Sequence, residues 1–110
     1  MKKLVLAAIT FALAGAVHAG NPEAGKEKSR TCAACHGADG NSATGDFPKL
    51  AGQHHDYLVK TLRDYKTGKR KSAIMAPMAA PLSERDIDDL AAFYSHQQGL
   101  VTRKNSYLVH

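Results

Sequence analysis

The sequence has no tryptophan, and only 6% of its 110 residues are aromatic. After residue 19 the chain keeps two phenylalanines and five valines or isoleucines. Strands are built mainly from β-branched and aromatic residues, so a β-sheet has almost nothing to form from. We therefore expect an all-α fold. The same shortage leaves so small a domain with little apolar surface to bury, and a group other than protein is expected to fill part of its core.

The 14 residues from Leu4 to Val17 form an apolar-rich stretch without charge. Two lysines precede it, and it ends in Val-His-Ala at residues 17–19, which offers small residues where a signal peptidase cuts. At 1.5 Å per residue the stretch reaches about 21 Å, short of the ~30 Å hydrocarbon core of a bilayer. We expect a signal peptide cleaved after Ala19, a periplasmic mature chain, and no transmembrane segment in it.

The chain has no strong excess of one charge, because residues 20–110 carry 13 Lys and Arg against 10 Asp and Glu. A formal charge of +3 does not indicate nucleic-acid binding. About 91 residues after cleavage also exclude a multidomain enzyme. The cluster of Lys66, Lys69, Arg70 and Lys71 is either a solvated loop or a surface that steers an acidic partner.

Three stretches have the start signals or the spacing of helices. They run from Asn21 toward Cys32, over residues 53–66, and from Ser83 to Gly99. Ser83 and Asp86 resemble a capping box at the start of the last one. Residues 36–51 are rich in Gly, Asp, Asn and Ser and are expected to form a loop. A second loop is expected from Gly68 to Leu82, because its two prolines prevent a continuous helix.

Both cysteines of the chain fall in one motif, Cys32-Ala-Ala-Cys35-His36. C-x-x-C-H is the attachment signal for c-type haem. Two thiols three positions apart on one helical turn can add to the two vinyl groups of one porphyrin, while the adjacent imidazole is held beneath the iron. The motif predicts thioether bonds at Cys32 and Cys35 and His36 as one axial ligand, whose second ring nitrogen needs a hydrogen-bond acceptor.

Other interpretations of the two cysteines are less favoured. A redox-active disulfide expects a βαβ scaffold, which the composition disfavours. A zinc site would need two further ligands from His36, His54, His55 and His96, and the adjacent pair His54-His55 would point apart on a helix. The third interpretation is that the motif occurs by chance at the end of a structural helix. The histidines outside the motif are expected to face solvent or to cap a loop.

The second axial ligand is expected to be a methionine, since a soft thioether suits a haem iron at positive potential. After residue 19 only Met75 and Met78 are available. The residues alone leave the choice between them open.

Several separated pieces of sequence occur in one order. They are Gly25 seven residues before Cys32, CAACHGADGNS at 32–42, FPKLAGQ at 47–53, MAPM at 75–78, and LS at 82–83 followed by DLAAFY at 89–94. With them the chain resembles a class I c-type cytochrome over roughly residues 22 to 98, and most of all one domain of the dihaem cytochrome c-four family or its short monohaem relatives.

The resemblance implies a small cytochrome c fold, three to five helices wrapped around one covalently bound haem c. It implies that Gly25 lets the first helix cross closely over the last, near Phe93 and Tyr94, and that the carbonyl of Pro48 accepts the N–H of His36. In the related proteins the ligating methionine stands eight residues before the serine that caps the last helix. This spacing selects Met75, with Met78 as second choice, which would then pack near the haem.

The predicted organisation is a cleaved signal peptide over 1–19, a monohaem cytochrome c domain over 20–99, and a C-terminal extension without an assigned role over 100–110. Tyr57 and Tyr65 are expected to be core residues. With both axial positions filled, the protein is expected to be an electron carrier of a respiratory chain and not an enzyme, as a monomer or weak dimer. Its partners would be redox proteins, such as a quinol-oxidising cytochrome complex as donor and a terminal oxidase or reductase as acceptor. The alternatives are a haem-bearing subunit of a larger oxidoreductase complex, and a five-coordinate haem protein with ligand-binding or peroxidase-like activity.

Overall fold

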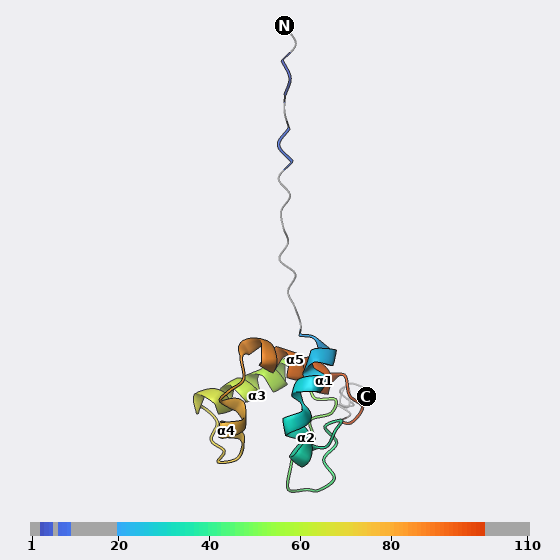
Figure 1. The fold of residues 1–110 in the computed structure, drawn as a ribbon, viewed down its shortest axis with the longest axis vertical. Helices are drawn as coiled ribbons and strands as arrows, with labels where there is room; N and C mark the ends of the chain where they lie inside the picture. Colours follow the sequence, from blue (N-terminus) through green and yellow to red (C-terminus); the bar gives the residue numbers. More distant parts are fainter. Residues whose placement is uncertain (1–2, 6, 10–19, 101–110) are drawn as a thin grey trace, which may run out of the picture.

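The computed structural model describes residues 3–5, 7–9 and 20–100. Its helices are α1 (Pro22–Lys28), α2 (Arg30–His36), α3 (His55–Thr67), α4 (Met75–Ala79) and α5 (Glu84–Ser95). The described residues contain no strand, and the prediction of an all-α fold is confirmed. Helix α5 packs against both α1 and α3, while α2 continues from α1 and α4 packs on α3. Figure 1 shows the result: α3 and α4 lie to one side of the molecule and α1 and α2 to the other.

Helix α1 begins where the sequence predicts. The side chain of Asn21 accepts hydrogen bonds from the backbone N–H groups of Glu23 (2.9 Å) and Ala24 (3.3 Å), and Pro22 takes the first helical position. The helix does not run unbroken toward Cys32. It ends at Lys28, and α2 starts after Ser29, whose hydroxyl donates to the carbonyl of Lys26 at 2.7 Å.

Helices α1 and α5 cross with their backbones in close contact at Gly25, as the resemblance implies. A Cβ atom at Gly25 would lie 2.0 Å from the carbonyl oxygen of Asp89 and 2.8 Å from the Cβ of Phe93. The buried carboxylate of Asp89 joins the two helices further, since it accepts from the backbone N–H of Asn21 (2.8 Å) and from Nζ of Lys28 (2.6 Å). The crossing therefore combines steric fit with a paired buried charge.

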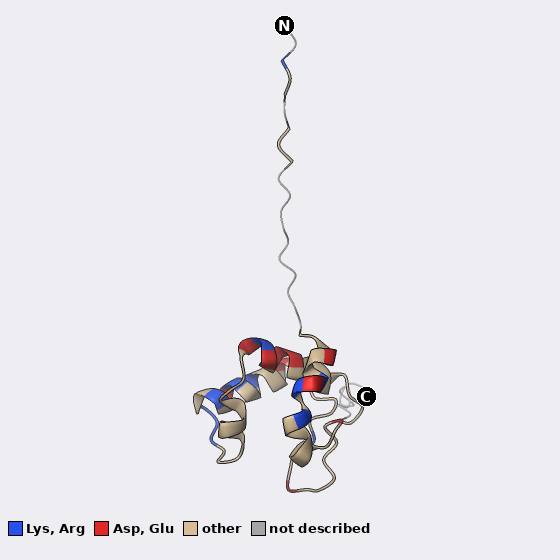
Figure 2. Ribbon diagram, in the orientation of Figure 1, with Lys and Arg blue, Asp and Glu red and all other residues tan. Residues whose placement is uncertain are grey.

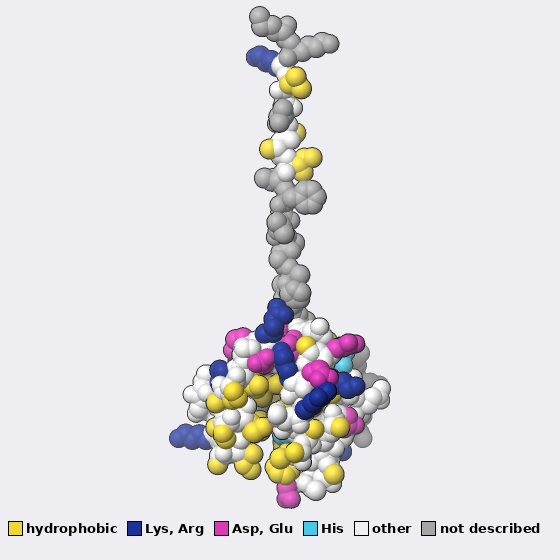
Figure 3. Space-filling model, in the orientation of Figure 1, with side chains coloured by type: hydrophobic (Ala, Val, Ile, Leu, Met, Phe, Trp, Pro, Cys, Tyr) yellow, Lys and Arg dark blue, Asp and Glu magenta, His cyan; other side chains and the backbone are white. Residues whose placement is uncertain are grey.

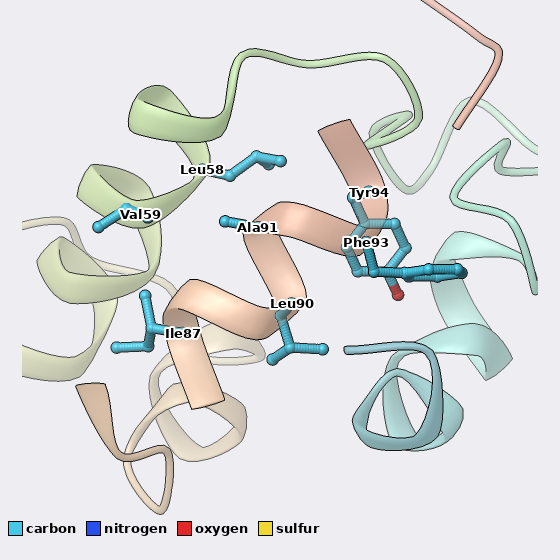
Figure 4. Close-up of a cluster of buried hydrophobic side chains, with 7 residues drawn as sticks. All are labelled: Leu58, Val59, Ile87, Leu90, Ala91, Phe93 and Tyr94. Atoms are coloured by element: carbon cyan, nitrogen blue, oxygen red, sulfur yellow. The ribbon is translucent and has the colours of Figure 1, made fainter. Parts of the chain in front are cut away.

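The largest group of buried apolar side chains lies between α3 and α5 and along α5 toward α1. Its members are Leu58, Val59, Ile87, Leu90, Ala91, Phe93 and Tyr94 (Figure 4). The rings of Phe93 and Tyr94 contact each other in a tilted arrangement, with 5.0 Å between centroids and 56° between planes. The predicted capping box starts α5, with reciprocal hydrogen bonds between Ser83 and Asp86. Among the described residues, Ile87 and Leu90 are the only large side chains with less than about 2% of their surface exposed, which agrees with the expected shortage of core.

Two further boundaries differ from those predicted. The segment expected to be loop between Gly68 and Leu82 contains the short helix α4, which accommodates Pro77 because the first N–H groups of a helix have no intrahelical acceptor. The last helix ends at Ser95 and not at Gly99. Beyond it the chain turns back, and the N–H of Leu100 donates to the carbonyl of Ala51 at 2.7 Å. Gly99 lies at this close approach, where a Cβ would be 2.5 Å from that carbonyl oxygen.

Tyr57 is not a core residue, because 49% of its surface is exposed. The core prediction for it was wrong, since helical spacing alone does not fix where the apolar face of α3 ends. Tyr65 is half-buried. The predicted signal peptide falls mostly outside the described residues, and so does the predicted extension apart from Leu100. In the described part of the chain, no helix has the length and hydropathy needed to cross a membrane.

Candidate functional site

Helix α2 carries the cysteines and the histidine of the motif in its last two turns. Cys32 and Cys35 are both free thiols of intermediate exposure. Their separation of three positions places them on one face of the helix. His36, the last residue of α2, is buried, with 6% of its surface exposed. Two reachable thiols thus stand beside one imidazole that is withdrawn from water.

The ring of His36 is fixed by the segment that follows. Its Nδ1 lies 2.9 Å from the carbonyl oxygen of Pro48, and the Phe47 ring meets it edge-on at 6.1 Å between centroids. A carbonyl can only accept, so Nδ1 is the nitrogen that carries the proton in this hydrogen bond. In the neutral ring this leaves the lone pair on Nε2, the form in which a histidine binds a metal.

Backbone hydrogen bonds hold the loop that presents Pro48. Gly40, with a φ of +83°, accepts through its carbonyl from the N–H groups of Leu50 (2.8 Å) and Ala51 (3.1 Å). A Cβ at Gly40 would lie 2.7 Å from the Tyr94 ring, so the loop is pressed against α5. The loop predicted over 36–51 is therefore an ordered support for the histidine.

Asn41 is a supporting residue that the sequence prediction missed. Its side chain donates to Asp39 (3.0 Å) and to the carbonyl of Gln98 (2.8 Å), which links the loop to the chain beyond α5. The side chain and then the backbone N–H of Asn41 lower the pKa of Asp39 below its usual range. The Asp-Gly-Asn sequence indicated a turn, but only the fold shows the contact with Gln98.

The two candidate methionines lie on α4. Met75 is half-buried, and its N–H donates to the hydroxyl of Ser72 at 3.0 Å. Met78 is 39% exposed. Helices α2 and α4 do not pack against each other, although they lie on the same side of α5 (Figure 1). The structure thus places the histidine and the methionines on two separate helices and not in contact.

A haem group fits this arrangement. Figure 3 shows apolar side chains gathered over the part of the molecule that holds α2 and α4, with most charged side chains over α1 and α5. The hydroxyl of Tyr94 is buried and has no hydrogen-bond partner among the described residues. Burial, and after it the neighbouring Cys32, raises the pKa of Tyr94 well above its usual range. Cys32 itself packs against the same apolar cluster. Two thiols for covalent attachment, an imidazole for the iron and an apolar surface for the porphyrin are what a covalently attached haem requires.

Two of the remaining histidines, His55 and His96, lie close to oxygen atoms away from this site. Nε2 of His55 lies 2.9 Å from a carboxylate oxygen of Asp88, and Nδ1 of His96 lies 2.6 Å from the carbonyl oxygen of Ala92. His54 precedes α3 and is exposed. His110 lies outside the described residues. Within the described ranges, no three His, Cys, Asp or Glu side chains group so as to hold a metal ion.

In the basic cluster of residues 66–71, two side chains contact other parts of the protein and two are exposed without such contacts among the described residues. The guanidinium of Arg70 lies over the Tyr65 ring, 5.0 Å from its centroid. Lys69 and Lys71 are exposed, and no ion pair or hydrogen bond of theirs is found among the described side chains. Lys66 instead donates to the backbone carbonyls of Ala80 (3.0 Å) and Leu82. Only part of the cluster is therefore available for steering a partner.

Comparison with known proteins bears on this site directly. Residues 22–98 match the model of the family described as Cytochrome c. Cytochrome c4 of Stutzerimonas stutzeri is 46% identical over 110 residues, which cover 91% of this chain and 52% of that protein. Cytochrome c-554(548) of Halomonas halodenitrificans is 46% identical over 83 residues, which cover 73% of this chain and all of that protein.

The fold is also found among solved structures. The crystal structure of reduced recombinant cytochrome c4 from Pseudomonas stutzeri superposes with a TM-score of 0.70 at 47% identity, over 74% of this chain and 48% of that one. The chain thus spans about half the length of the cytochrome c4 proteins that it matches, and it aligns with one domain of them.

Proposed function

The chain belongs to the cytochrome c family, and from this premise we propose that it is an electron-transfer protein carrying one electron on one covalently attached haem c. When bound, the haem supplies a one-electron Fe(III)/Fe(II) couple. The residues of this chain do the rest: they attach the group, hold two axial ligands in place, and exclude water from most of it.

Cys32 and Cys35 would hold the haem through thioether bonds. Both are free in the structure and lie three positions apart on α2, which suits two bonds to one porphyrin. Covalent attachment keeps the group through export and repeated turnover. It also accounts for how a chain with so few large buried side chains closes a core.

His36 would be the proximal ligand, and the observation that carries the proposal is its hydrogen bond to Pro48. The 2.9 Å contact orients the buried ring and sets the tautomer, with Nε2 left to bind iron. A purely structural role for His36 would not account for the two free thiols on the same helix. The cysteines, the imidazole and the carbonyl together support haem rather than zinc or disulfide chemistry.

Met75 would be the second axial ligand, with Met78 as the second choice. Met75 stands eight residues before Ser83, which caps α5, and it is the less exposed of the two methionines. With imidazole and thioether both bound, no position on the iron is open to a substrate. The protein would then act as a carrier and not as an enzyme, with little movement between its two redox states.

We place this activity in the periplasm, between redox partner proteins of the respiratory chain. A quinol-oxidising cytochrome complex is the donor class and a terminal oxidase or reductase the acceptor class that such a carrier would serve. The exposed cations Lys69 and Lys71 would speed association with an acidic partner. Because salt screens the attraction between exposed charges, the association rate with such a partner should fall as the ionic strength rises.

The test of covalent attachment is the mass of the full chain expressed with export and haem-attachment machinery. Wild type should gain the mass of one haem and keep its colour after acid denaturation, and it should begin at Gly20. A Cys32→Ala, Cys35→Ala double variant, exported in the same way, should be colourless. A wild-type protein with the mass of the polypeptide alone would contradict the proposal.

A further inference from the structure

The side chain of Lys66 joins two parts of the molecule that are distant in sequence. Lys66 lies one residue before the end of α3. Its ammonium group donates to the carbonyl of Ala80, 14 residues away, at 3.0 Å, and to that of Leu82, 16 residues away. Ala80 caps the end of α4, and Leu82 precedes the residue that caps α5. The lysine therefore connects α3 to the link between α4 and α5.

These two carbonyls are suited to a cation. The carbonyl of Ala80 stands at the C-terminal end of α4, where carbonyls have no intrahelical donor and carry partial negative charge. The carbonyl of Leu82 belongs to the link between α4 and α5 and offers a second acceptor. Helix α4 has only five residues, so it has little stability of its own. Its other end is anchored by Ser72, which accepts from the N–H of Met75 through its hydroxyl (3.0 Å) and from the N–H of Ala76 through its carbonyl (3.0 Å).

The position of α4 therefore depends on α3. Among the helices, α3 is the one that packs against it, and α2 does not reach it. Figure 2 shows Lys and Arg positions in the part of α3 that lies near α4. Lys69, three residues further on, is exposed and is a natural control, because it has the same charge without these carbonyl contacts among the described residues.

We propose that Lys66 is a positioning residue that holds α4 against α3 and so keeps the methionine sulfur on the iron. The inference rests on the proposed function, and it adds a residue outside the candidate haem-binding and axial-ligand residues. Without the ammonium, the two carbonyls lose their donor and the C-terminal end of α4 loses its hydrogen bond to α3. The methionine then leaves the iron more readily, and an added ligand competes with it more effectively.

The experiment is an optical titration of the haem-loaded ferric protein with imidazole, which can bind only where the methionine has left. Lys66→Met should bind imidazole on the order of tenfold more tightly than wild type, and the amides of residues 75–82 should exchange hydrogen faster. Lys69→Met should match wild type in both. Lys66→Arg keeps a long cationic donor and should restore most of the wild-type behaviour.

The outcomes distinguish a failure of methionine ligation from a failure of the role proposed for Lys66. A wild-type protein without a sulfur-to-iron charge-transfer band would overturn methionine ligation, and with it this inference. A wild type that shows the band, next to a Lys66→Met protein with unchanged imidazole affinity and exchange, would overturn the role of Lys66 alone. If Lys66→Met does not take up haem, Lys66→Gln is titrated instead, and an affinity equal to that of wild type rejects the proposal. Equal tightening in Lys69→Met would also reject it, since it would reflect lost charge and not lost contacts.

Discussion

Nδ1 of His36 lies 2.9 Å from the carbonyl oxygen of Pro48, twelve residues further along the chain. The acceptor belongs to the backbone of a loop. The two ends of this loop are joined by hydrogen bonds from the N–H groups of Leu50 and Ala51 to the carbonyl of Gly40. The ring orientation thus depends on how this loop is folded rather than on any one polar side chain. The methionines lie on a separate helix, which is held by different contacts. The two candidate ligand positions can therefore be perturbed independently.

The two methionines should differ in their effect on the iron. Met75→Ala should abolish the far-red sulfur-to-iron charge-transfer band of the oxidised protein and allow the reduced protein to bind CO rapidly. Met78→Ala should keep the band, because its side chain would only pack near the haem. Absorption spectra of both variants decide the matter, and the reverse pattern would assign the ligand to Met78.

Gly25→Ala should destabilise the protein by about 2 to 3 kcal/mol. The new methyl group would lie 2.0 Å from the carbonyl oxygen of Asp89, and a backbone atom cannot move away without shifting α5. Gly45→Ala is the matched control, because a Cβ there meets nothing within 4 Å. Denaturant unfolding of the haem-loaded proteins measures both. Equal stability of the two variants would show that the helices do not cross this closely.

The ion pair between Lys28 and Asp86 should make stability depend on pH in the acid range. Nζ of Lys28 lies 2.8 Å from Asp86, and this contact, followed by the backbone N–H of Ser83, lowers the pKa of Asp86 from 3.8 to about 2. A pKa that is lower in the folded state means that the contribution is present above about pH 4 and lost as the pH falls toward 2.

Asp86→Asn should therefore be less stable than wild type by about 1 to 2 kcal/mol at neutral pH, a range reduced for the partial exposure of the pair. The difference should shrink toward zero near pH 2. Asp46→Asn, in an exposed loop, should follow wild type throughout. Urea unfolding at several pH values gives these differences, and a gap that stays constant down to pH 2 would refute the assigned cause.

Tyr94 should not ionise while the protein is folded. Burial raises the pKa of its hydroxyl well above the usual range. In a spectrophotometric titration from about pH 9 to 11, Tyr94→Phe should leave the tyrosinate signal of the protein unchanged. Loss of signal in Tyr94→Phe would mean that the hydroxyl is open to water.

The sequence predicted those features that depend on local chemistry. The cap at Asn21, the capping box at Ser83 and the end of α3 at Gly68 follow from backbone geometry and nearby side chains, and all three are present. The resemblance also located the crossing at Gly25, because a glycine is required there by the close approach of two backbones.

Features that depend on tertiary contacts were not predictable in the same way. Helix α4 forms although Pro77 lies within it, and α5 ends early because Leu100 pairs with Ala51. Lys66 looked like one more member of a charged loop, and only the fold brings its ammonium to two carbonyls. The prediction that Tyr57 is a core residue was wrong, because helical periodicity locates the apolar face of a helix but does not say how many neighbouring positions that face includes.

The central claim, a covalent haem held by His36 and a methionine, is tested most directly by the visible spectrum of the exported protein in its oxidised and dithionite-reduced states. The account predicts sharp reduced bands, a weak far-red band in the oxidised form, and no rapid CO binding. A coloured protein with a high-spin spectrum and rapid CO binding would contradict methionine ligation. A colourless protein would contradict the whole assignment of Cys32, Cys35 and His36.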